Sequence, residues 1–67
     1  MVKFAERLTE TLKLKGLSFS AFARRIKVTP NTVCKWCNGD REPNYEMLLL
    51  ITKELEESTD YLLGLSD

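Results

Sequence analysis

Histidine is absent from the 67 residues of the chain, and cysteine occurs only twice. A structural zinc site needs four ligands, usually cysteine or histidine, so one copy of the chain cannot complete such a site. Histidine is also the side chain used most often as a general base, and no nucleophile in the sequence is paired with a base. The composition therefore argues against an enzyme, a resident metal and a cofactor, and no motif indicates a small-molecule ligand.

Long apolar runs are absent as well. No stretch reaches the roughly 20 apolar residues of a transmembrane helix, so no membrane association is expected. The first seven residues include Lys3, Glu6 and Arg7, and they lack the apolar core of a signal peptide. Without an export signal a reducing compartment is expected, and a disulfide framework is not. We therefore expect a cytoplasmic protein.

The length of the chain limits what it can form. We expect one domain covering residues 1–67. Such a small domain buries only roughly 60% of the surface of its unfolded chain. An enclosed cleft with its own supporting residues is hard to form at this size, whereas a surface element can bind a partner.

The net charge of zero hides an uneven distribution. Residues 1–41 carry nine basic and three acidic side chains, a net charge of +6. Residues 42–67 carry one basic and seven acidic side chains, a net charge of −6. The split predicts a basic face toward a polyanion and an acidic far end. The alternative is that any small domain has uneven charge.

Helical spacing recurs along the chain, and no alternation with period two is sustained. Four polar residues are suited to cap helix N-termini: Ser18, Thr29, Asn44 and Ser58. Pro30 falls at a first helical position, where its missing N–H costs nothing. The sequence predicts an all-α fold of five short helices at about residues 3–15, 19–26, 30–37, 45–56 and 59–64.

The helical stripes also predict the core. The residues expected inside are Phe4, Leu8, Leu12, Phe22, Ala23, Ile26, Val33, Trp36, Leu48, Ile51 and Leu55. The indole N–H of a fully buried tryptophan needs a hydrogen-bond partner. We therefore expect Trp36 to be partly exposed.

Two short helices joined by Lys27-Val28-Thr29 form a helix-turn-helix candidate. Landmarks at consistent spacing surround it along nearly the whole chain. They include Gly16-Leu17-Ser18, Phe22-Ala23, Val28-Thr29, Thr32-Val33, Lys35-Trp36, Asn38-Gly39, Pro43, Leu48-Leu49 and Asp60-Tyr61-Leu62-Leu63-Gly64. With them the sequence resembles the lambda-repressor-like, XRE/Cro-type helix-turn-helix family.

The resemblance implies a compact five-helix domain that binds duplex DNA, usually as a homodimer on a palindromic operator. Its third helix would lie in the major groove with its N-terminal residues on base edges. Asn31 suits adenine, the Thr32 methyl suits a thymine methyl, and Lys35 suits either guanine or a phosphate. The residues expected to read bases are Pro30, Asn31, Thr32, Cys34 and Lys35.

Phosphate contacts would come from the flanks of the third helix. A helix N-terminus favours anions, and the flanking turn and loop carry cations and an amide. The residues expected to bind phosphates are Ser18, Phe19, Lys27, Asn38 and Arg41. Alternatively, Ser18 and Asn38 serve only as helix caps, and Lys27, Lys35 and Arg41 are plain solvated charges. The roles of Arg24 and Arg25 are open.

The chain departs from the family pattern at several positions. Phe19 replaces a glutamine that bonds a phosphate, so only the backbone amide can make that contact. Lys27 stands where glycine is frequent, which costs on the order of 1 kcal/mol if φ is positive. Leu12 and Cys37 replace an arginine–glutamate pair, which predicts an apolar contact between them.

Leu50 replaces a residue that is usually polar. It predicts an exposed apolar patch for dimer formation, composed of Met47, Leu49, Leu50 and Leu63. The alternative is that Leu50 is tucked against the last helix.

The Cys34-Lys35-Trp36-Cys37 sequence invites a redox interpretation. A thioredoxin-like dithiol requires a βαβ context and a cysteine at a helix start, and this segment has neither. We instead expect Cys34 to face the groove and Cys37 to face the core. Oxidation sensing by an exposed Cys34 stays open.

The interpretation that accounts for most of these features is a sequence-specific DNA-binding transcriptional regulator of bacterial or phage origin. It would act as a repressor that occupies a promoter and would associate with the nucleoid when bound. The alternative is a protein-interaction module, antitoxin-like or scaffold, which has kept the fold and lost DNA binding. Phe19 and the neutral net charge favour the alternative slightly.

Overall fold

The computed structural model describes residues 3–65, which form five helices and contain no strand. In chain order these are α1 (Phe4–Leu14), α2 (Phe19–Ile26), α3 (Pro30–Asn38), α4 (Tyr45–Leu55) and α5 (Thr59–Leu63). The all-α prediction is confirmed, and each helix begins and ends within one residue of its expected range. Within the described residues no helix exceeds 11 residues, too short for a membrane span.

Polar side chains cap four of the helices at their N-termini, as their positions in the sequence predict. The hydroxyls of Ser18, Thr29 and Ser58 accept the backbone N–H three residues later, at 3.0, 3.3 and 3.0 Å. The amide oxygen of Asn44 accepts the N–H of Met47 at 2.8 Å. Such a cap contributes about 1 kcal/mol, so local sequence alone fixes most helix starts.

Four helices end on a residue in the left-handed conformation, and two of these residues are not glycine. Gly39 and Gly64 adopt φ values of 81° and 80° at the ends of α3 and α5. Lys27 ends α2 with φ 61°, and Glu56 ends α4 with φ 56°. A side chain in this conformation costs roughly 1–2 kcal/mol. The positive φ that the sequence suggested for Lys27 is thus observed, and it carries this cost.

The predicted stripes meet in one core. It contains the eleven residues of the helical stripes together with Leu62 of α5, which is fully buried. Cys37, which was also expected to face the core, is only partly buried against it. The expectation that Trp36 is partly exposed was wrong, since only 3% of it is exposed. The indole is covered because α1 and the loop after α3 pack over it, bringing Phe4, Ala5 and Arg41 to the same small hollow.

α5 is fastened to α1 at one end of the molecule. The Arg7 guanidinium lies 4.5 Å from the centre of the Tyr61 ring and donates to the Tyr61 carbonyl oxygen at 3.2 Å. Gly64 follows, and a Cβ added to it would lie 2.8 Å from the Cβ of Lys3. Glycine is required here because it permits both the positive φ and this close approach.

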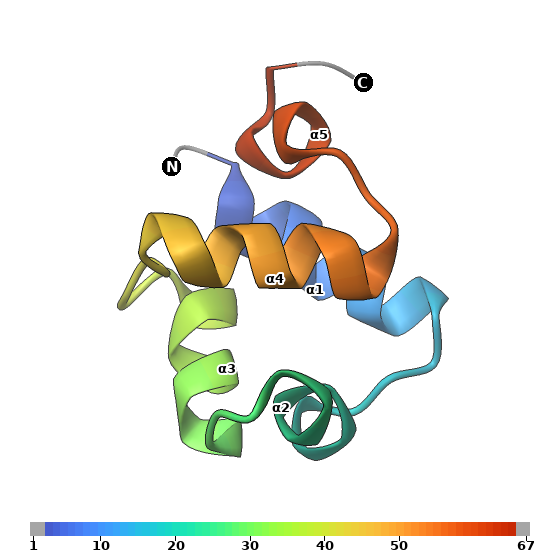
Figure 1. Ribbon diagram of the computed structural model, residues 1–67, viewed down its shortest axis with the longest axis vertical. Coiled ribbons are helices and arrows are strands. Elements are labelled where there is room, and N and C mark those ends of the chain that lie inside the picture. Colours follow the sequence, from blue (N-terminus) through green and yellow to red (C-terminus); the bar gives the residue numbers. More distant parts are fainter. Residues whose placement is uncertain (1–2, 66–67) are drawn as a thin grey trace.

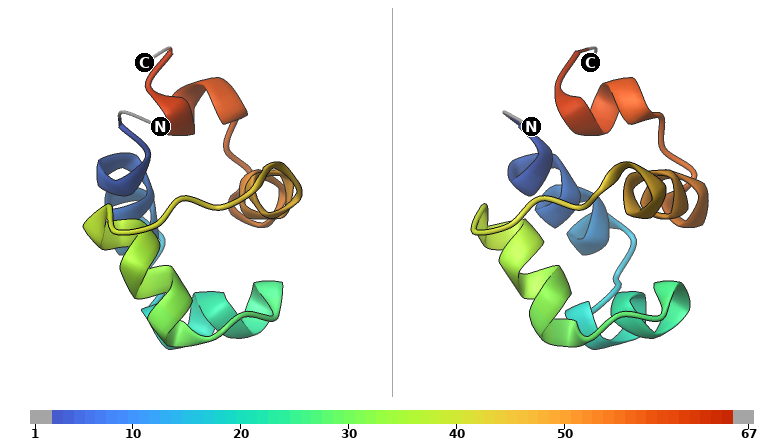
Figure 2. Two further views of the ribbon diagram at one scale, coloured as in Figure 1. Left: turned by 90° about the vertical axis from the view of Figure 1, so that its left-hand side faces the viewer. Right: turned by 60° about the vertical axis from the view of Figure 1, so that its left-hand side comes forward.

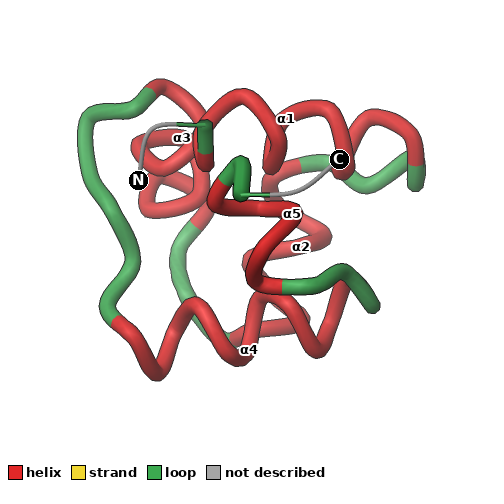
Figure 3. Tube along the Cα trace, turned by 90° about the horizontal axis from the view of Figure 1, so that it is seen from above, coloured by secondary structure: helices red, strands yellow, loops and turns green. Residues whose placement is uncertain are grey.

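The helices divide the molecule into two ends. α2 and α3 pack on each other at one end, and α5 lies at the other, with α4 crossing between them (Figure 1). In side view α1 backs the upper part of α3, and α4 is seen nearly end-on (Figure 2). The loop joining α3 to α4 runs extended along one side (Figure 3). The helix-turn-helix pair is thus presented away from the acidic α5 end.

Candidate nucleic-acid interface

The N-terminal end of α3 projects its first side chains into solvent. Pro30 and Asn31 are exposed, and Thr32 is half-buried. Val33, one residue further, is fully buried against the core. Val33 therefore anchors the N-terminal end of α3 in the core, while the Asn31 side chain is free to reach a partner.

Two threonines hold the start of α3 in shape. The Thr29 and Thr32 hydroxyls are hydrogen-bonded to each other at 2.9 Å, in addition to the cap from the Thr32 N–H to the Thr29 oxygen. Because the Thr32 hydroxyl is engaged in this pair, its methyl group is its simplest contact with a base. A thymine methyl is a suitable target for such a group.

One turn further along α3, a cysteine and an asparagine interact on the outer face. Cys34 and Lys35 are half-buried, and Asn38 is exposed. The Asn38 side-chain amide donates to the Cys34 sulfur at 3.5 Å. One N–H of that amide still points elsewhere, because the group has two donors. Cys34 thus orients Asn38 without consuming its capacity to bind an anion.

Ser18 and the N-terminal end of α2 form a second candidate anion-binding position. The Ser18 carbonyl accepts the first intrahelical bond from the Phe22 N–H at 3.0 Å. The amides of Phe19 and Ser20 precede that bond and are available to an anion. The Phe19 side chain is 37% exposed and lines a hollow of ≈ 330 Å³ together with Leu12 of α1.

The loop after α3 folds back on the helix end and carries Arg41. The amides of Asp40 and Arg41 both donate to the Lys35 carbonyl, at 2.9 and 3.3 Å. The Arg41 side chain is exposed, and it shares a hollow of ≈ 350 Å³ with Thr32. A residue expected to bind phosphate and one expected to read bases are thereby brought side by side.

Lys27 is exposed in the turn between α2 and α3. Its backbone is held by the N–H of Val28, which donates to the Ala23 carbonyl at 2.9 Å. Ser18 and Lys27 sit at opposite ends of α2, which spans 8 residues, or roughly 12 Å at 1.5 Å per residue. The ten residues expected to contact DNA are all exposed or half-buried.

Lys13 was not among the expected contacts, although the structure places it near them. It lies on α1, is exposed, and lines the same hollow as Ser18 and Phe19. In the sequence it is a lysine near the C-terminal end of the first expected helix, at about residues 3–15. Its neighbours depend on how α1 packs against the start of α2, and no local pattern reports that.

The two thiols lie in different surroundings. Cys37 is half-buried and packs against the core, though less completely than expected. Burial raises the pKa of the Cys37 thiol above its ordinary value; a hydrogen bond with the Thr9 side chain opposes this, and nearby Cys34 adds to it. Over residues 3–65 no three potential metal-binding side chains come together.

The expected dimer patch divides into exposed and covered members. Leu49 and Leu50 are 44% and 47% exposed, whereas Met47 and Leu63 are half-buried and pack against the core. Leu50 faces α2, where it lines a hollow with Ile26. It is therefore not tucked against α5, which was the alternative considered for it.

Comparison with known proteins agrees with this geometry. The helix-turn-helix family matches residues 8–62, which include α2, α3 and α4 in full. The chain is 35% identical over 60 residues to YqaE of Bacillus subtilis (strain 168), described as an uncharacterized HTH-type transcriptional regulator. The match takes in 90% of this chain and 52% of YqaE, so the chain spans about half the length of that relative.

No solved structure gives a significant match. The family match covers most of the chain, including the two helices and the turn that the sequence resemblance singled out. The resemblance is confirmed: the chain belongs to the helix-turn-helix family, of the XRE type.

Proposed function

We propose that the protein is a sequence-specific, double-stranded DNA-binding transcriptional regulator that inserts α3 into the major groove. The observation that carries this proposal is the exposed N-terminal end of α3, held rigidly by Thr29 and Val33 in a helix-turn-helix chain. Asn31 would read adenine through two hydrogen bonds, with Thr32, Cys34 and Lys35 alongside.

Phosphate contacts would surround this helix and set its register. The start of α2, with the Ser18 hydroxyl and the Phe19 amide, would hold one phosphate, and Lys27 would hold another at the far end of the helix. Asn38 and Arg41 would contact the backbone beyond the end of α3. These contacts position the domain and carry no sequence information themselves.

The charge distribution supports this orientation. Residues 1–41 carry the net charge of +6 and include α2, α3 and Lys27. The acidic remainder includes α4 and α5, and α5 lies at the far end of the molecule (Figure 1). Duplex DNA would attract one end and repel the other, so the domain would approach with α3 foremost.

We further propose that two copies bind a palindromic operator and repress by occupying a promoter. Leu49 would be the exposed centre of the expected patch, since Met47 and Leu63 are largely covered and Leu50, the fourth member, faces the hollow against α2. The half-sites would be about 34 Å, or one helical turn, apart. The regulator name of YqaE supports a role in transcription. The protein would act in the cytoplasm of a bacterium, encoded there or by a phage.

The experiment that tests the function is a selection from a random duplex pool, sequenced after several rounds at moderate salt. Enrichment of a palindrome with half-sites one turn apart would support a dimeric, sequence-specific regulator. Enrichment of a single half-site would support base reading by α3 and would refute binding as a dimer. A pool that stays unenriched would refute sequence-specific binding.

Asn31→Ala sharpens the test. The substitution should weaken binding to the selected site by roughly 1–3 kcal/mol and leave binding to random DNA nearly unchanged. Fluorescence anisotropy with the two duplexes measures both. An equal loss on both duplexes would exclude a base-reading role for Asn31.

A protein-interaction module is the second candidate, because Phe19 replaces the phosphate-binding glutamine and the net charge is zero. The two functions differ in their response to salt. Binding to DNA weakens steeply as salt rises, because counterions are released from the phosphates. An apolar protein interface would change little between 50 and 200 mM salt, a range in which about six phosphate contacts lose roughly 10³-fold in affinity.

A further inference from the structure

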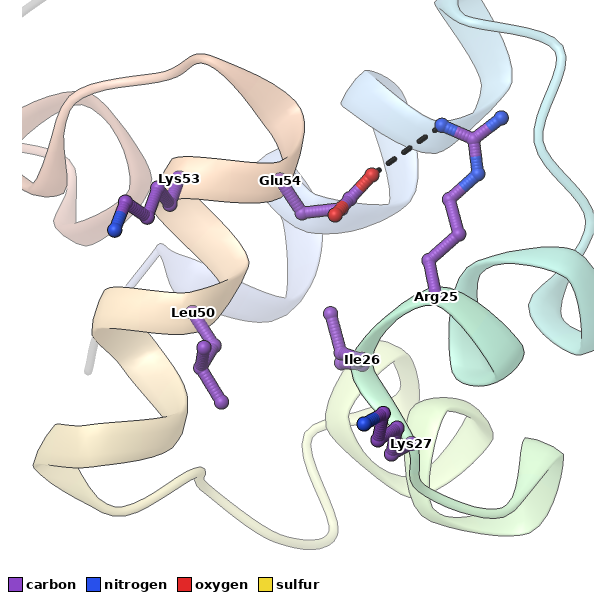
Figure 4. Close-up of a pocket in the computed structure, with 6 residues that line it drawn as sticks. All are labelled: Arg25, Ile26, Lys27, Leu50, Lys53 and Glu54. Atoms are coloured by element: carbon purple, nitrogen blue, oxygen red, sulfur yellow. Dashed lines mark hydrogen bonds and ion pairs between the residues drawn. The ribbon is translucent and has the colours of Figure 1, made fainter.

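A hollow of ≈ 400 Å³ opens between the C-terminal end of α2 and the outer face of α4. Six residues line it: Arg25, Ile26, Lys27, Leu50, Lys53 and Glu54. Leu50 of α4 and Ile26 of α2 face each other across it (Figure 4). The hollow lies outside the base-reading end of α3 and shares only Lys27 with the expected DNA contacts.

The floor of the hollow is apolar and accessible. Leu50, which lines the hollow, is 47% exposed. Ile26 is buried, so the floor is anchored on the core and leaves one leucine side chain half uncovered. Covering a leucine contributes roughly 1.5–3 kcal/mol when it is completely buried, so this floor favours an apolar side chain from outside.

The rim of the hollow is positively charged. Arg25 and Glu54 form an ion pair of 3.3 Å that joins α2 to α4 along one side. Lys27 and Lys53 have no ion-pair partner among residues 3–65, which leaves the rim with a net charge of +2. Lys53 is also the one cation of residues 42–67. Floor and rim together select an occupant that is apolar and acidic.

We propose that this hollow docks an acidic, amphipathic segment of a partner protein. An apolar side chain of the segment enters between Ile26 and Leu50, and flanking carboxylates pair with Lys27 and Lys53. Duplex DNA is a poor occupant, because its backbone has no apolar side chain to cover the floor. The Arg25–Glu54 pair closes one side of the hollow, so the two cations left for the carboxylates of the segment are Lys27 and Lys53.

Docking has a consequence for DNA that rests on the proposed function. That function places Lys27 on a phosphate, and the same ammonium lies on the rim of the hollow. The segment and the DNA backbone then compete for one cation, and the segment brings carboxylates close to the phosphates. The partner acts as an antagonist that loosens the regulator from its operator.

The test uses the full chain and a fluorescein-labelled helical peptide of about 15 residues, with leucines at i, i+3 and i+4 spacing and glutamates elsewhere. The control peptide has lysine in place of every glutamate. Anisotropy should show that the glutamate peptide binds at least about tenfold more tightly than the lysine peptide, because only the former complements the rim. Equal affinities would overturn the charge argument.

Variants locate the peptide on the surface. Leu50→Asp should weaken the glutamate peptide by about tenfold or more, since the apolar contact is lost. Leu14→Asp is the matched control, because Leu14 is 85% exposed and lies on α1 outside the hollow. Lys53→Gln should also weaken the peptide and leave DNA binding unchanged. Equal losses in Leu50→Asp and Leu14→Asp would overturn the site.

Competition separates this proposal from the proposed function. Saturating peptide should weaken binding to the selected duplex by about tenfold, because one phosphate contact is lost. Peptide binding without any DNA binding would refute the proposed function and leave the docking site standing. DNA binding without peptide binding would refute the docking site. If the protein forms a dimer that excludes the peptide, and Leu50→Asp dissociates this dimer, the docking proposal is overturned: the occupant of the hollow is then a second copy of the chain.

Discussion

Replacing Lys27 with glycine should stabilise the domain and weaken its binding to DNA. Lys27 has φ 61°, is exposed, and forms no ion pair among the described residues. Glycine relieves a strain of roughly 1–2 kcal/mol but adds roughly 0.4–1 kcal/mol of entropy to the unfolded chain. The net gain in the free energy of unfolding is about 0.5–1 kcal/mol. For a domain of this size the gain corresponds to a rise of roughly 2–8 °C in Tm.

The same substitution removes one cation from the turn between α2 and α3. If Lys27 contacts a phosphate, the slope of log K against log salt concentration should fall in magnitude by about 0.9. Thermal unfolding followed by circular dichroism gives the first quantity, and anisotropy across a salt series gives the second. Lys27→Gln separates the two effects, because it keeps the strained backbone and removes the charge.

Glu56→Gly is the matched control for the backbone term. Glu56 has φ 56° and ends α4, outside the helix-turn-helix pair. It should give a similar gain in stability with no reduction of the salt slope. A loss of stability in Lys27→Gly would refute the strain argument, and an unchanged salt slope in both Lys27 variants would remove Lys27 from the phosphate contacts.

Three further predictions concern the packing of α5 and the two thiols. In chemical denaturation Gly64→Ala should destabilise the domain by about 1–2 kcal/mol more than Gly16→Ala. Both glycines have positive φ, but only a Cβ at position 64 would lie 2.8 Å from the Cβ of Lys3. Equal losses of stability in the two variants would contradict the close approach. Burial raises the pKa of Cys37, so the contribution of this thiol to the free energy of unfolding should be constant below pH 9.0. It should fall as the pH rises from there through the folded-state pKa. A Cys37→Ala variant should lose this part of the decline in the free energy of unfolding, and an unchanged pH profile would contradict the burial effect. Binding of operator DNA should slow the reaction of Cys34 with a thiol reagent.

The helices could be predicted because their boundaries are local. The capping hydroxyls of Ser18, Thr29 and Ser58 bond amides three residues away, so a short window of sequence contains both partners. The core stripes follow for the same reason, since residues four apart share a helix face. The exposed end of α3 was predictable as well, because Pro30 and Asn31 follow a cap directly.

The features that escaped prediction all depend on distant segments. The burial of Trp36 is produced by α1 and the loop at residues 39–44, and its sequence neighbours do not report that cover. Lys13 comes beside Ser18 only through the packing of α1 on α2. The direction of Leu50 depends on the angle between α2 and α4. Helical periodicity specifies which face of α4 points into the core, but it does not specify which other helix lies beside the flanking residues.

The contact between Lys3 and Gly64 means that the described chain nearly closes into a ring. A short peptide joining the two ends would cyclise the backbone with little rearrangement, and it would reduce the entropy of the unfolded chain alone. New ends could then be opened in the loop between α3 and α4, which runs along the outside (Figure 3). Such a circular permutant would keep every helix and bring its termini next to α3, where a cross-linker or a fluorophore would lie beside the proposed DNA-binding helix.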